Sequence, residues 1–142
     1  MRGTSLVERF SWFVAGFWWS SLAVTGFIVV PQLFAHLPTS LMAGNMAARL
    51  FAIQTGISVL CALWLLMLTR AHTSGRAAAV ACQSLVWILG GMLLSLVSQF
   101  VVSPHIVARD HLALWHSIGS TMYLVQWLCA GIVCWRLSAP QE

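Results

Sequence analysis

The sequence predicts an all-α fold, an integral membrane four-helix bundle with both termini in the cytoplasm. Hydrophobic residues make up 60% of the 142-residue chain, charged residues make up 7%, and the mean hydropathy is +0.87. These values lie outside the range of ordinary soluble domains. The few charges are also spaced far apart, and the arginines are unevenly shared between the two sides of the resulting topology. We therefore expect a single four-span transmembrane domain over residues 1–142.

Four long stretches of the chain carry no formal charge. They lie between Arg9 and Arg49, Arg49 and Arg70, Arg76 and Arg109, and Asp110 and Arg136. A helix rises about 1.5 Å per residue, so roughly 20 apolar residues cross the hydrocarbon of a bilayer. We place the spans at about 11–31, 47–69, 78–102 and 113–135.

The first span resembles a secretory signal because Arg2 and Arg9 precede its apolar run. The run nevertheless contains the bulky pair Trp18 and Trp19, and no small-x-small cleavage pattern ends it. We expect it to be retained as a membrane anchor.

Two connections follow from proline and capping residues. Pro31 and Pro38 are expected to bracket the turn after the first span, with Thr39 or Ser40 capping a second helix that runs to about residue 69. That helix is longer than the hydrocarbon is thick, so its first turns should stand in the interface.

In the third span the pair Gly90-Gly91 is expected either to kink the helix or to admit a close neighbour. Ser103-Pro104 is typical of a helix start. If that helix runs unbroken into the fourth span, one face carries His105, Arg109, His116, Ser120, Tyr123 and Trp127. A break near Asp110 would remove His105 and Arg109 from this face.

The positions of the arginines predict the orientation. One side carries Arg2, Arg9, Arg70, Arg76 and Arg136, whereas the other carries Arg49 and Arg109. The positive-inside rule then places both termini in the cytoplasm, and we expect a cell inner membrane of bacterial type. The formal net charge of +4 comes from scattered arginines, so no basic patch for nucleic acid is present.

This topology gathers most of the ionisable residues at the outer face: His36, Arg49, His105, Arg109, Asp110, His111 and His116. Because Glu8 and Glu142 belong to the termini, Asp110 is the one carboxylate there, and we predict a structural ion pair between Arg49 and Asp110. Two interpretations stay open. The pair fixes the register of the bundle, or it forms part of a binding site for a cation or an acidic ligand.

His116, with Ser120 one turn and Tyr123 two turns later, has two interpretations as well. It is a donor between helices, or it binds copper or haem iron together with His36 or His105, because neutral imidazole suits these metals. His111 and His116 are five residues apart and point in different directions on one helix, so they do not form an i, i+4 chelate. The expected cofactor is therefore none, with haem or copper as the alternative.

Enzyme chemistry finds little support. The outer side lacks a second carboxylate, and no phosphate-binding loop or nucleophile–histidine arrangement is recognisable. All four cysteines fall inside predicted spans, as buried apolar residues do: Cys61, Cys82, Cys129 and Cys134. A redox role remains only through bound haem, for which the protein would supply axial histidines.

Three blocks of the sequence resemble the transmembrane-protein-205-like family, small four-span membrane proteins with a domain of unknown function. They are VVPQLFAHLP at 29–38, MAGNMAARLF at 42–51 and LALWHSIGSTMYLVQWL at 112–128. The matching positions are Pro31, Leu33, Phe34, Gly44, Arg49, Leu50, Phe51 and His116. The resemblance implies a multi-pass membrane protein without an established reaction.

The sequence thus favours a non-enzymatic membrane protein whose outer cluster organises the bundle and binds a small cation or a partner. The expected partners are the lipid bilayer, a second copy of the chain or another membrane protein, and not nucleic acid. The alternative is a haem- or copper-binding redox or transport protein that uses His116 with His36 or His105. Plain transport ranks lowest, because the strongly polar residues deep in the spans are Gln54, Gln83 and Gln126, with no carboxylate beside them. We detect no internal repeat.

Overall fold

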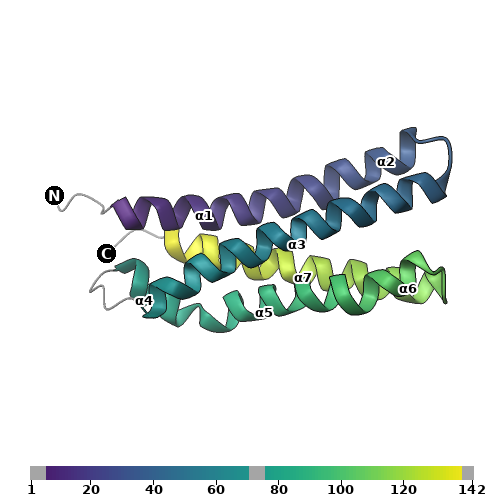
Figure 1. Ribbon diagram of the computed structural model, residues 1–142. Helices are drawn as coiled ribbons and strands as arrows, with labels where there is room; N and C mark the ends of the chain where they lie inside the picture. Colours follow the sequence, from purple (N-terminus) through teal and green to yellow (C-terminus); the bar gives the residue numbers. More distant parts are fainter. Residues whose placement is uncertain (1–5, 71–75, 139–142) are drawn as a thin grey trace.

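A computed structural model of the chain describes residues 6–70 and 76–138. Within this part, four helices are long and apolar enough to cross a membrane: Arg9–His36, Ser40–Leu68, Leu85–Val107 and Leu112–Ser138. They pack side by side as an extended all-α bundle (Figure 1). The predicted all-α membrane bundle with four long apolar helices is confirmed, and the helices extend beyond the expected limits at most ends.

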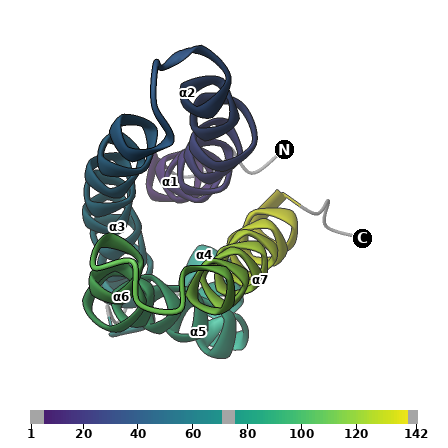
Figure 2. The same ribbon diagram turned by 90° about the vertical axis from the view of Figure 1, so that its right-hand side faces the viewer.

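The four rods are built from the following elements: α1 (Leu6–Ala23), η1 (Val24–Val29) and α2 (Val30–His36); α3 (Ser40–Arg70); α4 (Arg76–Gln83), α5 (Leu85–Val97), η2 (Ser98–Val102) and α6 (Ser103–Val107); and α7 (Leu112–Ser138). Seen from one end, they form a ring in chain order, which α7 closes by packing against α1 (Figure 2). We call residues 6–70 hairpin 1 and residues 76–138 hairpin 2. The end that carries the turns at 37–39 and 108–111 is called the distal end.

Tight packing lies in the half of the bundle away from the distal end. Trp18, Leu22, Leu65, Ile88 and Val133 are fully buried there and come from all four rods. Gly91 makes the close approach possible, because Trp18 lies where a Cβ on Gly91 would stand. Helix α5 runs unbroken through Gly90 and Gly91, so this pair admits a neighbour and does not interrupt the helix.

Pro31 and Pro104 do not mark helix boundaries, which corrects the expected turn at Pro31 and the expected helix start at Ser103-Pro104. Each proline follows a π-helical turn, η1 or η2, and the rod continues through it. The Val30 N–H donates to the Thr25 carbonyl and the Ser103 N–H to the Ser98 carbonyl, both five residues back. Proline lacks an N–H and clashes with the carbonyl four residues back. A widened turn just before it, a recognised form of the π-bulge, accommodates both.

The two turns at the distal end differ. Thr39 caps α3 as predicted, since the Met42 N–H donates to its Oγ1 at 3.3 Å. In hairpin 2 the helix breaks at residues 108–111, where Arg109 and His111 have φ values of 59° and 41°. Of the two possibilities left open by the sequence, the break near Asp110 is the one that occurs.

The two hairpins follow a similar local pattern in sequence and backbone, which is not predicted from the sequence. FIVVPQLFAH at 27–36 aligns with FVVSPHIVAR at 100–109, and the two five-residue backbone bonds before the prolines share the same offset of 73. In the next helices Leu-Phe-x-Ile-Gln at 50–54 aligns with Met-Tyr-x-Val-Gln at 122–126, offset by 72 because the stretch from the proline to the glutamine is one residue shorter in the second hairpin. The repeat was missed because it preserves helix architecture and a short motif, with little overall identity.

Equivalent residues of the two copies meet at the centre of the ring. The rings of Phe51 and Tyr123 pack edge to face with centroids 5.2 Å apart. Trp18 and Gly91, equivalent under the offset of 73, are also in contact. The hairpins are therefore related by an approximate two-fold axis that runs along the bundle, the arrangement of parallel repeats in a membrane.

Candidate functional site

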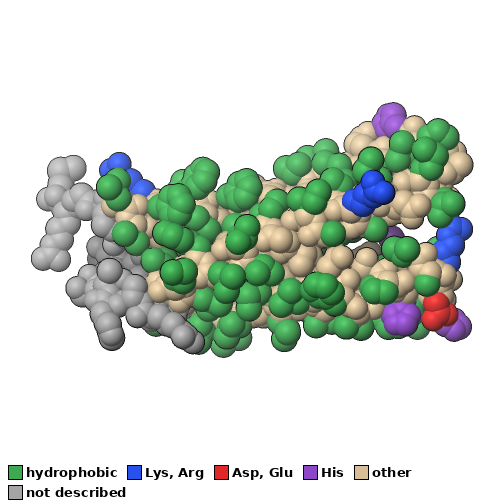
Figure 3. All heavy atoms as spheres, viewed as in Figure 1, with side chains coloured by type: hydrophobic (Ala, Val, Ile, Leu, Met, Phe, Trp, Pro, Cys, Tyr) green, Lys and Arg blue, Asp and Glu red, His purple; other side chains and the backbone are tan. Residues whose placement is uncertain are grey.

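Toward the distal end α2 and α7 separate, while α3 stays in contact with η2 and α6, and the two hairpins enclose a cavity. Helix α2 packs against α3, while α7 packs against α6 and η2 at the same level. The resulting cavity has a volume of about 400 Å³. A second space of about 450 Å³ shares His116 and Phe34 with it and continues to the distal turn. Figure 3 shows the surface hollowed in this region, between the helices of hairpin 1 and those of hairpin 2.

The floor of the cavity is a layer of amides and hydroxyls near the middle of the bundle. Gln54 and Gln126, both 3% exposed, are equivalent residues near the midpoints of α3 and α7. Gln54 donates to Ser21 Oγ at 3.0 Å and accepts from Thr25 Oγ1 at 3.2 Å. Gln126 donates to Ser58 Oγ at 3.0 Å. The amides thus tie three of the four rods together, and their geometry is fixed.

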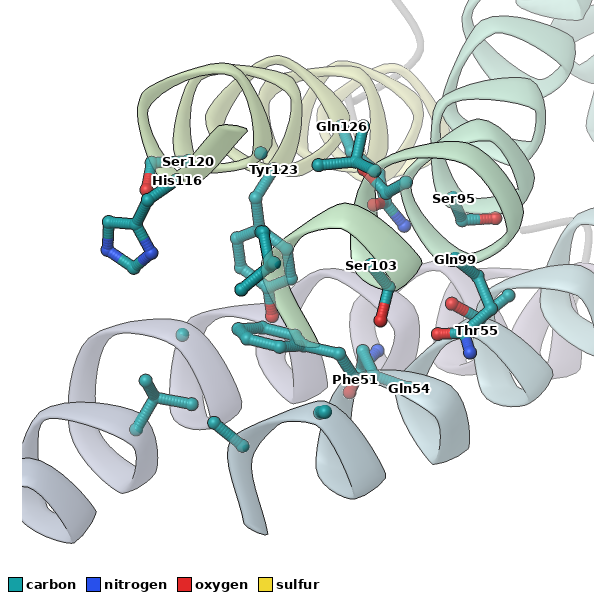
Figure 4. A pocket seen from close by; sticks show the side chains of 18 of the residues that line it. Phe51, Gln54, Thr55, Ser95, Gln99, Ser103, His116, Ser120, Tyr123 and Gln126 are labelled. Carbon is teal, nitrogen blue, oxygen red and sulfur yellow. The ribbon is translucent and has the colours of Figure 1, made fainter. Parts of the chain in front are cut away.

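Tyr123 forms the wall above this floor. Its hydroxyl donates to the Leu22 carbonyl at 2.8 Å, just before η1, so the phenol joins α7 to the first rod. Gly26 lies directly against the ring, and a Cβ at that position would collide with it. Figure 4 shows Tyr123 beside Phe51 at the centre of the cavity. Because its hydroxyl is already a donor to the backbone, Tyr123 contributes shape rather than a free donor.

Helix η2 supplies buried polar atoms that have no partner. Ser98 Oγ and Gln99 Oε1 are both buried, and neither forms a hydrogen bond within the described residues. Both residues line the cavity. An unpaired buried acceptor costs about 1–3 kcal/mol, so such atoms are usually satisfied by water or by a bound molecule.

The distal part of the cavity is wider and more open. His116 and Ser120 are exposed, and their side chains border the space without a hydrogen bond to another described residue. Figure 4 shows His116 projecting from α7 at the side away from Gln99. Arg109 lines only the outer space. A molecule entering from the distal end therefore passes Arg109 and His116 before it reaches the buried amides.

Asp110 lies between two histidines in the distal turn. Its Oδ2 is 3.6 Å from His105 Nδ1 and its Oδ1 is 3.7 Å from His111 Nε2. His105 also stacks on Trp115, with ring centroids 4.2 Å apart. Figure 3 shows this acidic side chain flanked by histidines at the distal end. The expected contact of Asp110 with Arg49 is not formed; Arg49 lies exposed on α3.

The remaining predicted site residues are spread over the distal half. His36 is exposed at the end of α2, where its Nδ1 is 3.0 Å from the Gln32 carbonyl oxygen. His116 lies at the cavity, apart from the cluster around Asp110. Among the residues that the structure describes, no three of His, Cys, Asp and Glu lie close enough to hold a metal ion.

Sequence reasoning missed most of the cavity. Gln54 and Gln126 were recognised as polar residues deep in the spans, but Ser98, Gln99 and Ser103 were not considered as site residues. One signal in the sequence could have located them: the repeated Phe-x-Val-x-Pro motif at 27–31 and 100–104 marks the two helices that separate around the cavity.

A protein-family model described as "Domain of unknown function (DUF4149)" matches residues 13–114. The match covers hairpin 1 almost completely and continues to the first turn of α7, which is more than half of the chain. It supports the expectation of a domain of unknown function, while the resemblance to transmembrane-protein-205-like proteins stays a prediction. No curated protein and no solved structure matches the chain.

Proposed function

Because the chain belongs to the family defined by the domain of unknown function DUF4149, we propose its function from the cavity: this multi-pass membrane protein binds a small uncharged molecule between its two hairpins. The observation that carries the proposal is a cavity of about 400 Å³ whose deep end is built of buried amides and hydroxyls. Ligand sites in proteins have volumes of roughly 300–1,000 Å³ and combine an apolar lining with a few fixed polar groups.

The charge of the lining supports an uncharged ligand. No arginine, lysine, aspartate or glutamate borders this cavity within the described residues. An ion at this depth would lose its hydration without gaining an opposite charge, which is costly in free energy. Hydroxyl and amide groups, by contrast, replace the hydrogen bonds that a neutral polar molecule makes to water.

The cluster around Asp110 has a different proposed role. Its contacts to His105 and His111 join the end of α6 to the start of α7, so we assign it to holding the distal turn. We also propose that the exposed histidines of this cluster bind a small cation or a partner protein. Haem or copper ligation by His116 with His36 or His105 stays the alternative, because the contacts of His36 and His105 use Nδ1 and leave Nε2 available.

Three further proposals rest on the sequence. The whole chain forms one transmembrane domain, it lies in a bacterial inner membrane with both termini in the cytoplasm, and it is related to transmembrane-protein-205-like proteins. The arginine distribution supports the orientation. The three sequence blocks support the relationship.

A pair of cavity-filling and lipid-facing variants tests the proposed function. Ala48 borders the cavity, whereas Ala52, one turn later on α3, is exposed and does not. Native mass spectrometry of protein purified in mild detergent should show a small-molecule adduct on wild type and on Ala52→Trp. The adduct should be lost in Ala48→Trp, because the indole occupies the cavity. An equal adduct on both variants, or none on wild type, contradicts the proposal.

A further inference from the structure

We propose that the molecule held in the cavity is mostly apolar and carries hydroxyl or N–H donors along one edge, as a phenol or a ring alcohol does. The inference rests on the proposed function and names the ligand class for the same site. It follows from how the two copies of the hairpin pattern differ where they face each other.

Above the polar floor, to which hairpin 1 contributes Gln54 and Thr55, the two hairpins contribute walls of different character. In five pairs of equivalent residues that both line the cavity, hairpin 1 supplies the apolar member and hairpin 2 the polar one: Gly26 and Gln99, Val30 and Ser103, Gly44 and His116, Ala48 and Ser120, Phe51 and Tyr123. No lining pair differs in the opposite sense among the described residues. Figure 4 shows Gln99 and Ser103 reaching into the cavity from one side and Phe51 from the other.

The two walls are built from similar helices, and their equivalent residues differ in polarity in one direction only. This difference fits a ligand with one apolar and one polar side. Its apolar side lies on hairpin 1, where Phe27, Val30 and Phe34 border the cavity. Its polar edge lies on hairpin 2. A ligand that is polar all round would leave its hydrogen bonds unmade against hairpin 1.

On the polar wall a buried hydrogen-bond acceptor lacks a donor. Gln99 Oε1 is a buried carbonyl oxygen without a donor, and Ser98 Oγ beside it is also unpaired. Tyr123 and Gln126 already donate to the Leu22 carbonyl and to Ser58 Oγ, whereas the Ser98 hydroxyl, which can both donate and accept, has no partner among the described residues. A hydroxyl or N–H on the ligand therefore satisfies Gln99 Oε1, whereas a ligand with acceptors alone does not.

The route to the cavity fits such a molecule. His116 and Ser120 are exposed, and the hollow between the hairpins is visible on the side of the bundle in Figure 3. In a membrane that side faces lipid as well as the distal interface. A mostly apolar molecule partitions into lipid and reaches the opening from there.

Two probes of matched shape test the inference: 2-naphthol, which carries one donor, and 2-methoxynaphthalene, in which a methyl group replaces it. Binding is measured by equilibrium dialysis against the full-length protein in nanodiscs, with protein-free nanodiscs subtracted. Wild type should bind the naphthol about tenfold more tightly, the change expected for one good hydrogen bond. Gln99→Leu should remove the preference, whereas the same change at the exposed Gln83 should preserve it.

Each outcome has a defined meaning. Equal affinity of the two probes in wild type, or a preference that survives Gln99→Leu, overturns the inference; the proposed function still stands if Ala48→Trp abolishes binding of both. Failure of wild type to bind either probe also overturns the inference, whereas the proposed function is tested separately by the small-molecule adduct on wild type. Since Gln99→Leu removes an unpaired buried acceptor, its thermal midpoint should not fall. Should it fold poorly, Gln99→Met keeps the side-chain length and provides the same comparison.

Discussion

Gly90 and Gly91 show that the effect of adding a side chain to a glycine depends on its surroundings. They are neighbours on α5, but a Cβ at Gly91 would lie 2.9 Å from Trp18 Cη2, whereas one at Gly90 would lie 4.0 Å from Cys129 Sγ. The sequence could predict that the pair either bends the helix or admits a neighbour. It could not predict which glycine faces the partner, because that depends on the rotation of α5 against α1.

This contrast gives a direct prediction. Gly91→Ala should lower the free energy of unfolding by about 1–3 kcal/mol, the usual cost of adding volume to a packed core. Trp18 is fully buried and has no space into which its ring can move. Gly90→Ala, with only an ordinary contact, should be neutral or slightly stabilising, because alanine favours helix. Thermal unfolding of both variants in the same detergent measures the difference. Equal midpoints would show that α1 and α5 are farther apart than described.

The ion pair expected from sequence illustrates a second limit at this scale. Elimination left Asp110 as the one carboxylate near Arg49, but elimination ignores distance along the bundle. Arg49 lies about three turns into α3, whereas Asp110 lies in the distal turn, where two histidines are nearer. Counting charges predicts which ionisable residues share one side of the membrane, but it does not predict which of them form an ion pair.

At the scale of the element, the four spans were predictable because hydrophobic length is a strong physical constraint. The interruptions within them were not. Proline was interpreted as a boundary after Val30 and after Ser103, since it removes a backbone hydrogen bond. In the long rods of this bundle the lost bond is accommodated by π turns instead, and these turns place Gly26 and Gln99 at the cavity.

The helix break at 108–111 yields a second prediction. Arg109 has φ of 59°, in the left-handed region that is costly for any residue with a Cβ. Arg109→Gly should therefore raise stability by about 1 kcal/mol, after allowing for the greater freedom of glycine in the unfolded chain. Ala108→Gly is the matched control, because Ala108 has φ of −70° and its change should destabilise. Thermal midpoints of both variants test the turn; a loss in Arg109→Gly would show that its side chain matters more than its backbone.

At the scale of the whole molecule, the arrangement of the two similar hairpins explains why the cavity lies where it does. They pack tightly along one half of their common axis, through Trp18, Gly91 and their neighbours, whereas along the other half α2 separates from α7 while α3 stays in contact with η2 and α6. The sequence revealed the polar residues at the centre but not the separation, since hydropathy is the same for a closed and an open bundle. Aligning the two motifs by their offset shows that serines and glutamines scattered along the sequence lie on one wall of the cavity.

The orientation of the molecule decides from which side a ligand reaches this wall, because the cavity opens toward the distal end. In the predicted four-span topology five of the seven arginines belong to the side of the termini, so the positive-inside rule predicts cytoplasmic termini and a distal end on the outer side. Alkaline phosphatase, which needs the periplasm to become active, should be active when fused after Pro38 and inactive when fused after Glu142. Green fluorescent protein should show the reverse pattern, which controls for expression. Phosphatase activity after Glu142 would invert the topology. The cavity would then open to the cytoplasm, and its ligand would have to be a molecule of the cell interior.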